Sequence, residues 1–369
     1  MLYVTACVRF ADLIGYLRRS KQYMKKVLFL LLLTLSVGVL SGCKAKPVES
    51  VSGTGFYFDT FCTFTIYGTE DESIIEDLKA ECLRYEKVFS TTNYESELYR
   101  LNHGETNEVS EDLYECVSRA LTLCSYSKGH YDISIRPISR QWSFTQYDQC
   151  VPDKESIDEG LKRVNYSDVI LKADDGKYRI EMANDMQLDL GSVAKGYIAD
   201  RLGVLLMNMG IKSAVISLGG NVKCLGSKPA SNDSEEYTSF CIAVKSPFAG
   251  EDGSNEEDNG YADIVYIKDM SVVTSGIYER GFEKDGVFYH HLLDAKTGYP
   301  VENDLASVTI ITESSYNADL LSTVCFLLDY DKTVELKNAG IIEDFEAEFI
   351  YKDRSVRRTE GFEKYIKTE

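Results

Sequence analysis

Strand-like and helix-like segments follow one another irregularly along this chain, and their order is what most constrains its fold. Apolar and polar residues alternate over 57–67, which is typical of a strand, whereas 76–88 and 111–126 carry apolar residues at helical spacing. Regular βαβ alternation, which would indicate a parallel sheet, is not evident in the pattern. The sequence therefore predicts an α+β fold, with residues 57–369 forming one domain of two interleaved α/β lobes.

The second half of the chain continues the irregular order. It is interrupted over 227–262 by acidic, Gly- and Ser-rich stretches, which predict solvated loop insertions, with a calcium site as the alternative. The remaining elements are expected as a hairpin joining 169–171 to 178–182, strands at 213–218, 240–244, 264–267, 271–274, 307–311, 345–351 and 355–358, and helices at 196–209 and 317–328.

The first 42 residues are expected to lie outside this domain. Met24-Lys25-Lys26 precedes an apolar run over 27–40, which is shorter than the roughly 20 residues that a transmembrane helix needs. Small residues then lead to Cys43, which is the pattern of a secretory signal. The ending resembles a bacterial lipobox, so the signal is expected to start at Met24 and Cys43 to carry a lipid. A plain signal anchor is the alternative.

A lipid on Cys43 would place the protein on the extracytoplasmic face of the cell membrane, with residues 44–56 as a tether. The formal net charge of −19 argues against a nucleic-acid partner, because a phosphate backbone would be repelled. The same charge argues against electrostatic attachment to anionic lipid. The ten cysteines are scattered and are expected to be mostly buried apolar residues, although the sequence leaves their pairing open.

Asp319 and Thr323 lie four residues apart on a predicted helix and therefore share one face. Together with Ser322 they offer one carboxylate and two hydroxyls, a set of hard oxygen ligands that suits Mg²⁺. The alternative is an aspartate that stabilises the helix N-terminus through the helix dipole. Taken with the motifs around it, the pattern favours a magnesium site.

Two further patches could bind or process a phosphate. Lys195 lies between small residues at a strand-to-helix turn, a setting that resembles phosphate cradles, and Asp189 beside it could bind a ring N–H or help to position a metal. His291 can exchange a proton near neutral pH, and Asp294 could orient it or bind a substrate hydroxyl. Gly219-Gly220 would let a ligand approach the backbone, although a plain turn explains it equally well.

Taken together, these residues resemble the ApbE-type flavin transferases, over nearly all of the chain from about Tyr57. The motifs that carry the resemblance are Ser90…Ser96-Glu97-Leu98…Asn102, Gly129-His130-Tyr131-Asp132, Asp189-Leu190-Gly191…Lys195-Gly196-Tyr197…Asp200, Leu218-Gly219-Gly220-Asn221, Thr274-Ser275-Gly276, His291-Leu292-Leu293-Asp294…Thr297-Gly298 and Ala318-Asp319…Thr323.

The resemblance implies a monomer that binds FAD between its two lobes, with Mg²⁺ at the pyrophosphate. His291 matches the family histidine implicated in activity, and Asp294 is kept as the second catalytic candidate. Two departures bear on this. Phe58-Asp59-Thr60 stands where family members usually carry Met-Gly-Thr, and Thr92 stands where many carry an aromatic residue. By position, the metal ligands would be Ser192, Asp319, Ser322 and Thr323, and the FAD contacts would be Phe58, Thr92, His130, Tyr131, Asp132, Asp189, Lys195 and Leu293.

The activity implied is Mg²⁺-dependent transfer of FMN from FAD to a threonine or serine hydroxyl, with release of AMP. The acceptor would be an exported flavoprotein of an electron-transfer complex, carrying an Asp-Gly/Ala-x-Thr-like segment. Two alternatives keep the flavin site. One is a Mg²⁺-dependent FAD pyrophosphatase, and the other is a non-catalytic flavin-binding lipoprotein.

Overall fold

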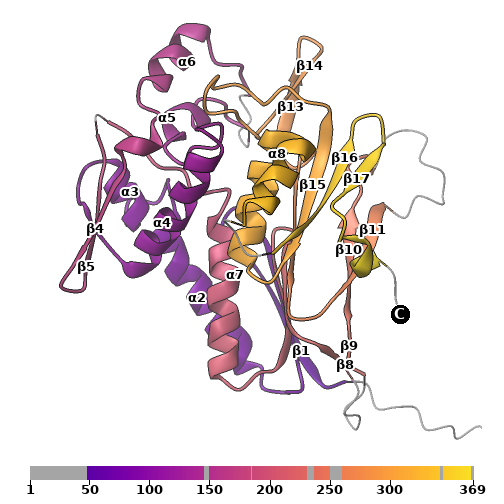
Figure 1. Ribbon diagram of the computed structural model, residues 1–369. Helices are drawn as coiled ribbons and strands as arrows, with labels where there is room; N and C mark the ends of the chain where they lie inside the picture. The colour runs from indigo at the N-terminus through magenta and orange to yellow at the C-terminus, as the bar shows by residue number, and fades with distance from the viewer. Residues whose placement is uncertain are drawn as a thin grey trace, which may run out of the picture. The chain divides into compact units, whose positions relative to one another are not determined.

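The computed structural model describes residues 48–144, 149–183, 185–230, 237–249, 260–340 and 344–366, and its fold is a mixed α+β fold, as predicted (Figure 1). The predicted signal and Cys43 lie outside the described residues, as do 231–236 and 250–259 of the acidic stretch. Within the described ranges, no helix combines the length and the apolar character that crossing a membrane requires.

The centre of the fold is an eight-stranded sheet in which every neighbouring pair of strands is antiparallel. Its first two strands come from the start of the domain and the other six from residues after 212, so the sheet closes around a long excursion of the chain. In sheet order the strands are β1 (Ser50–Tyr57), β2 (Thr60–Tyr67), β6 (Ser213–Leu218), β7 (Asn221–Gly226), β12 (Ser271–Gly276), β15 (Leu305–Thr312), β16 (Glu346–Tyr351) and β17 (Val356–Arg358).

Helices α7 and α8 lie side by side over one face of this sheet (Figure 1). The excursion between β2 and β6 supplies most of the remaining helices and a small three-stranded sheet. The helices are α2 (Ser73–Phe89), α3 (Glu97–Asn102), α4 (Glu111–Tyr126), α5 (Arg136–Ser139), α6 (Lys154–Leu161), α7 (Ala194–Asn208), α8 (Ser315–Asn338) and α9 (Glu363–Ile366), and the small sheet holds β3 (Glu108–Val109), β4 (Ile170–Asp174) and β5 (Lys177–Glu181).

Three short two-stranded sheets complete the structure. They pair β8 (Lys228–Pro229) with β9 (Tyr237–Thr238), β10 (Phe240–Lys245) with β11 (Tyr261–Ile267), and β13 (Gly281–Lys284) with β14 (Val287–His290). The main core fills the space between the helices and the large sheet, and β15 is buried at every position. A second core lies under β10, β11 and α9, and a third surrounds Trp142. Six of the eight described cysteines are buried, as predicted.

The strand predicted over residues 57–67 is wrong. Residues 57–67 are not one strand, because Phe58 and Asp59 form a two-residue turn with φ of 56° and 57° between β1 and β2. The tether predicted for 44–56 is also wrong over its second half, since β1 starts at Ser50 and pairs with β2 along its whole length. Helix α8 passes beyond its predicted end at Leu328, where non-helical Asp329 marks a kink.

Candidate active site

Helices α7 and α8 meet where a glycine faces an aspartate. The backbone N–H of Gly196 donates to Asp319 Oδ2 at 2.9 Å. A Cβ at position 196 would lie 2.3 Å from the carbonyl oxygen of Ser315, so only glycine allows this approach. One turn later on α7, Asp200 accepts hydrogen bonds from the N–H groups of Ser315 and Tyr316 and thereby caps α8. The contact fixes Asp319 relative to the start of α7.

Asp319 is a buried carboxylate. Asp319 is 5% exposed. No basic side chain among the described residues forms an ion pair with its carboxylate within 4.0 Å. Burial raises the pKa of Asp319, while the charge of Lys195 and the hydrogen bond from Gly196 oppose this rise. Because an uncompensated buried charge is costly, the position fits a bound cation.

The next turn of α8 carries two hydroxyl groups, those of Ser322 and Thr323. Ser322 Oγ donates to the carbonyl oxygen of Asp319 at 2.8 Å and lies 2.7 Å from Ser275 Oγ at the end of β12. Thr323 Oγ1 lies 3.4 Å from the same Ser275 Oγ. The predicted helix face is therefore confirmed in its geometry, with Ser275 as a further hydroxyl beside it.

The loop before α7 brings a second set of oxygens. Ser192 Oγ lies 3.0 Å from the hydroxyl of Tyr131. Burial raises the pKa of Tyr131 well above its usual range. In the described part of the chain, no three His, Cys, Asp or Glu side chains gather into a metal site. A cation here would use one carboxylate with hydroxyl and carbonyl oxygens, which suits Mg²⁺ when substrate phosphates complete its shell.

The charged groups at the start of α7 are held by local contacts. Lys195 Nζ donates to the carbonyl oxygen of Gly191 at 3.0 Å, and its charge acts on Asp319. Asp189 accepts hydrogen bonds from Ser139 Oγ at 2.6 Å and from the N–H of Gly191 at 3.0 Å. Lys195 and Asp189 therefore both lie on the segment that leads into α7, and the ammonium of Lys195 is placed to neutralise an anionic ligand.

His291 has the geometry of a neutral base. Its ring Nδ1 lies 3.1 Å from the carbonyl oxygen of Arg280, and its backbone N–H donates to the same oxygen. Since a carbonyl oxygen only accepts, Nδ1 carries the hydrogen and Nε2 is left to accept a proton. Burial lowers the pKa of His291 to about 4, and the positive charges of Arg280 and Lys195 act in the same direction.

Asp294 does not orient His291, so that part of the sequence prediction is wrong. Its Oδ2 lies 2.9 Å from Nδ1 of His130, and its Oδ1 accepts the N–H of Lys296. The carboxylate thus closes a turn and joins it to a histidine 164 positions earlier in the chain. The prediction assumed that Asp294 contacts the nearby His291, whereas the folded chain pairs it with the distant His130.

Two predicted FAD contacts form part of the scaffold. Asp132 is buried, and its oxygens accept hydrogen bonds from the N–H and hydroxyl of Ser134 and from the N–H of Tyr166. Leu293 is buried in the third core beside Trp142, whose indole N–H donates to the carbonyl oxygen of Gly298. Their side chains support the loops around the site.

Two other predicted FAD contacts lie near the C-terminal end of α2. Phe58 is half-buried, and its backbone N–H donates to Glu86 Oε1 at 3.1 Å. Thr92 is exposed on the following loop, where its N–H donates to Ser90 Oγ. Helix α2 therefore ties the β1–β2 turn to this loop, although the two segments are separated by more than 30 residues.

The chain is similar in sequence to known proteins. The sequence profile of the ApbE family matches residues 58–345. The chain belongs to the ApbE family. It is 31% identical over 346 residues to the FAD:protein FMN transferase of Treponema pallidum, covering 89% of this chain and 92% of that protein. It is 32% identical over 291 residues to a Klebsiella pneumoniae protein of the same name, covering 78% and 85%.

Solved structures of the ApbE family share the fold. The ApbE protein of Thermotoga maritima has a TM-score of 0.74 and 28% identity, covering 87% of this chain and all of that one. The apo form of the flavinyl transferase ApbE of Pseudomonas stutzeri has a TM-score of 0.71 and 26% identity, covering 87% of this chain and 98% of that one. The predicted fold and family are thus confirmed.

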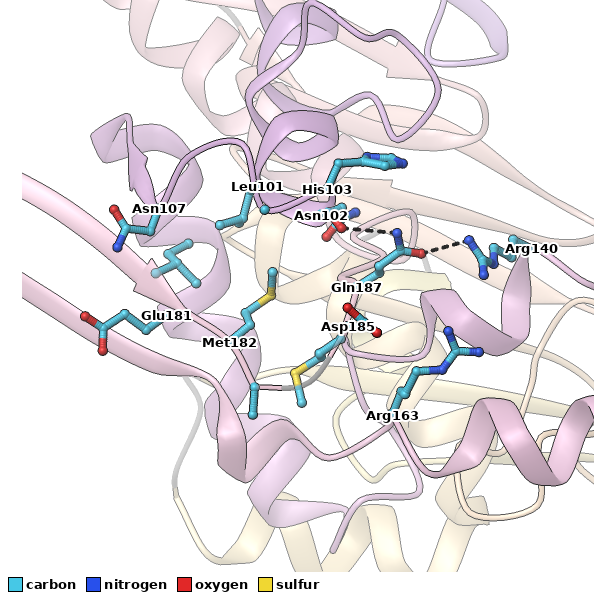
Figure 2. Close-up of a pocket in the computed structure, with 14 residues that line it drawn as sticks. Leu101, Asn102, His103, Asn107, Arg140, Arg163, Glu181, Met182, Asp185 and Gln187 are labelled. Atoms are coloured by element: carbon cyan, nitrogen blue, oxygen red, sulfur yellow. Dashed lines mark hydrogen bonds between the residues drawn. The ribbon is translucent and has the colours of Figure 1, made fainter.

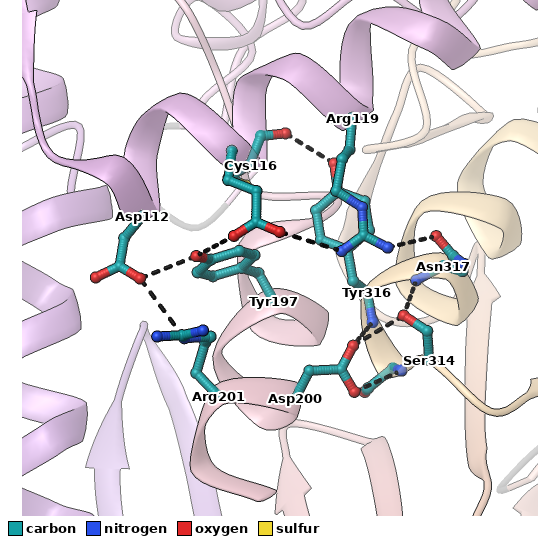
Figure 3. Close-up of polar contacts among 11 residues, drawn as sticks. Asp112, Cys116, Arg119, Tyr197, Asp200, Arg201, Ser314, Tyr316 and Asn317 are labelled. Atoms are coloured by element: carbon teal, nitrogen blue, oxygen red, sulfur yellow. Dashed lines mark hydrogen bonds and ion pairs between the residues drawn. The ribbon is translucent and has the colours of Figure 1, made fainter. Parts of the chain in front are cut away.

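Polar contacts join α4, α7 and the start of α8 in this ApbE-family chain (Figure 3). The hydroxyl of Tyr197 donates to Asp112 Oδ1 at 2.9 Å. The guanidinium of Arg119 lies over the ring of Tyr316 at 4.3 Å, and the hydroxyl of Tyr316 donates to the carbonyl oxygen of Cys116. These contacts hold the two helices that carry Lys195 and Asp319.

Replacing Tyr197 with phenylalanine is expected to lower the free energy of unfolding by about 1–2 kcal/mol, because a buried hydroxyl that bonds a carboxylate is lost. Urea unfolding should show a lower midpoint with an unchanged m-value. Tyr178→Phe is the matched control, since its hydroxyl bonds Glu111 at the surface and should contribute little. Equal effects in the two variants would contradict a structural role for the Tyr197 contact.

A cavity of about 500 Å³ lies beside this site, between α3, β5 and the loop after β5 (Figure 2). Gln187 is central to it, donating to the carbonyl oxygen of Asn102 and accepting from Arg140. None of the described residues that line the cavity is a predicted FAD or metal position. The lining residue Asn102 also exchanges hydrogen bonds with the backbone of Leu188, so the side chains around the cavity hold the segment that leads to Asp189.

Sequence reasoning missed the structural role of several site residues. Glu86 and Arg280 hold the β1–β2 turn and His291 through long-range hydrogen bonds, which carry no local signal. Ser275 belongs to a motif that supported the family resemblance, but a Thr-Ser-Gly segment alone does not indicate a hydroxyl beside a metal site. The Thr-Ser-Gly segment forms the end of β12, and its place beside α8 depends on the packing of the helix on the sheet.

Proposed function

We propose that this enzyme transfers FMN from FAD to a threonine or serine hydroxyl of an acceptor protein, with Mg²⁺ and with release of AMP. The observation that carries the proposal is the Asp319 carboxylate, which is buried, has no ion-pair partner among the described residues, is acted on by the charge of Lys195 and lies one helical turn before Ser322 and Thr323. A pyrophosphate with a cation supplies the charges that this arrangement needs. The names of the Treponema pallidum and Klebsiella pneumoniae relatives support the same reaction.

Asp319, Ser322, Thr323 and the backbone carbonyl of Ser192 would hold the cation. When bound, Mg²⁺ would neutralise charge on the pyrophosphate and favour departure of AMP. Lys195 would bind the phosphates directly, since its ammonium lies at the start of α7, where backbone N–H groups also favour anions. Asp189, held by Ser139, would bind a ring N–H of the flavin.

His291 would take the proton of the acceptor hydroxyl. The hydroxyl oxygen forms a bond to the FMN phosphorus as the bond from that phosphorus to the oxygen of AMP breaks, and the proton passes to Nε2. The tautomer fixed by the carbonyl of Arg280 leaves Nε2 available for this step. The low pKa keeps the ring neutral and ready to accept at neutral pH.

The pH dependence of transfer tests this role. The rate is expected to stay nearly level from pH 8 to about 5 and to fall as the pH approaches 4, because His291 then becomes protonated. His291→Ala should transfer much more slowly, without that step, while FAD binding is retained. Near-normal transfer by His291→Ala would exclude the role.

Acid stability must be followed in parallel. His290 and His291 both have pKa values lowered to about 4 by burial, against 6.5 ordinarily. The unfolded chain therefore binds more protons between these values, so stability falls as the pH drops from 6.5 towards 4. Initial rates should be taken only where unfolding controls show a folded protein.

The reaction products distinguish the transferase from the two alternatives, an FAD pyrophosphatase and a non-catalytic flavin carrier. Incubation with FAD and Mg²⁺, with and without an acceptor domain, should give AMP in step with covalent FMN when the acceptor is present. Free FMN and AMP at the same rate in both reactions would favour the pyrophosphatase. FAD that is bound but never cleaved would favour the carrier.

We further propose that the protein is a monomer exported and held by a lipid on Cys43 at the extracytoplasmic face of the cell membrane. Its acceptors would then be exported flavoproteins of electron-transfer complexes with an Asp-Gly/Ala-x-Thr-like segment. The short distance in sequence from Cys43 to β1 at Ser50 supports a domain kept close to the membrane. Membrane release of a Cys43→Ala variant would test the anchor.

A further inference from the structure

The turn between β6 and β7 fixes the position of Asn221, a buried residue that is not among the proposed metal ligands or FAD contacts. Leu218 and Asn221 pair across the two strands, and Gly219 and Gly220 close the turn between them with φ of 62° and 90°. The N–H of Gly219 donates to the carbonyl oxygen of Phe61 at 3.1 Å, which ties the turn to the neighbouring strand β2. Asn221 therefore begins β7 at a well-defined place in the sheet.

One face of β7 lies against the junction of α7 and α8. Asn221 and Lys223 share this face, because side chains two positions apart on a strand point to the same side. Lys223 Nζ pairs with Asp200 of α7 at 2.8 Å, and Asp200 in turn accepts the N–H of Ser315. Asn221 Oδ1 accepts a hydrogen bond from the hydroxyl of Ser315 at 2.6 Å. The side chain of Asn221 therefore reaches the first residue of the helix that carries Asp319.

Ser315 and Asp319 lie one turn apart on the same face of α8. Gly196 approaches both of them, since a Cβ at this glycine would lie 2.3 Å from the carbonyl oxygen of Ser315 and 2.7 Å from Cβ of Asp319. The amide of Asn221 meets the same face at Ser315. Burial raises the pKa of Asp319, and the amide of Asn221 is one of the groups that oppose this rise, as an N–H group beside the carboxylate should.

The amide nitrogen of Asn221 is buried without a hydrogen bond of normal geometry to any described residue. Asn221 is 2% exposed, and its Nδ2 is shielded from solvent. Leaving a buried N–H group unpaired is costly, so such a group normally has an acceptor close by. An amide that faces a carboxylate presents its N–H₂ group, because its oxygen would be repelled. The bond from the Ser315 hydroxyl to Oδ1 agrees with this orientation and leaves Nδ2 for Asp319.

We propose that Asn221 is a positioning residue of the metal site, whose Nδ2 donates to the Asp319 carboxylate and holds it in the orientation that the cation needs. The N–H of Gly196 already donates to Asp319 Oδ2. One hydrogen bond leaves a carboxylate free to turn about its bond to Cβ, whereas a second donor fixes its plane. Partners of this kind typically change metal affinity by about tenfold to a hundredfold. The inference rests on the proposed function, which places a cation at Asp319.

Two other roles for the Asn221 amide lead to different results. If Nδ2 donated directly to a phosphate oxygen of FAD, its loss would weaken FAD binding even without metal. If the amide served only to attach β7 to α8 through Ser315, its loss would lower the stability of the fold and leave the Mg²⁺ affinity unchanged. Metal affinity, FAD affinity and stability must therefore be measured on the same variants.

The test uses Asn221→Leu, which fills a similar space without a donor, and Asn221→Ala, which removes the amide with less risk of a clash. The Mg²⁺ concentration that gives the half-maximal transfer rate should rise at least about tenfold in both variants. The rise in Tm that a fixed Mg²⁺ concentration causes with FAD present should shrink accordingly. The Kd for FAD in EDTA should change less than about twofold. Saturating Mg²⁺ should restore most of the transfer rate, which a damaged fold would not allow.

Asn303→Ala is the matched control, because the Asn303 amide also bonds α8, donating to the carbonyl oxygen of Phe326 at 2.8 Å. It should lower the urea midpoint and leave the Mg²⁺ dependence unchanged. The same result for the Asn221 variants would overturn the inference, and so would a loss confined to the Kd for FAD. Wild-type protein whose transfer and Tm do not respond to Mg²⁺ would refute the proposed function, and the inference with it.

Discussion

Asp319→Asn is expected to lower FMN transfer by roughly a hundredfold to a thousandfold, the loss typical when one electrostatic group at a reaction centre is removed. Asparagine has nearly the same shape and can still accept the hydrogen bond from Gly196, so the contact between α7 and α8 should persist. The variant loses the negative charge that a cation would need. The change therefore separates the charge of Asp319 from its structural role.

Two measurements check this expectation. Transfer should be followed by intact mass of the acceptor, and Mg²⁺ binding by the rise in Tm that the metal causes in the presence of FAD. Wild-type protein should show that rise, and Asp319→Asn should not. Asp331→Asn, an exposed aspartate on α8 that pairs with Arg357, is the control and should behave as wild type. Normal transfer by Asp319→Asn would exclude it as a metal ligand.

Gly196→Ala is expected to lower the free energy of unfolding by about 2–3 kcal/mol and to reduce transfer as well. The added Cβ would lie 2.3 Å from the carbonyl oxygen of Ser315 and 2.7 Å from Cβ of Asp319. Both neighbours belong to α8 near its backbone, so the helices must separate to make room. Asp319 would then move away from the loop that carries Ser192.

Gly203→Ala is the matched control on the same helix. Its Cβ would meet the end of the flexible Lys223 side chain, which can move, and alanine favours a helix by about 1 kcal/mol over glycine. We expect this variant to be as stable as wild type or more stable, with normal transfer. If both glycine variants lost the same stability in urea unfolding, close approach of α7 and α8 would not be the reason for Gly196.

Periodicity predicted the regular elements well. Strand β6 and helix α4 have the predicted bounds, and α2 starts three residues earlier and ends one residue later than predicted. The predictions for these segments are close because one face of each segment packs on the core, and this packing fixes the spacing of its apolar residues. The spacing of Asp319 and Thr323 likewise placed both on one face of α8, since that inference needs only a helix.

Turns and distant pairings could not be predicted in the same way. The β1–β2 turn uses Phe58 and Asp59 at positive φ, where glycine or asparagine is usual, so the sequence carries no turn signal there. The pairing of Asp294 with His130 joins residues 164 positions apart. Such contacts depend on the packing of whole segments, and local spacing pointed instead to the neighbouring His291.

The most direct test of the account is to incubate the chain from residue 44 with FAD, Mg²⁺ and a flavoprotein domain carrying an Asp-Gly-Ala-Thr segment, and to determine the intact mass of the domain. The account predicts one covalent FMN on the threonine, matched by one AMP, and no labelling with EDTA or in a domain whose threonine is replaced by alanine. FAD cleaved to free FMN and AMP with the domain unlabelled would contradict it.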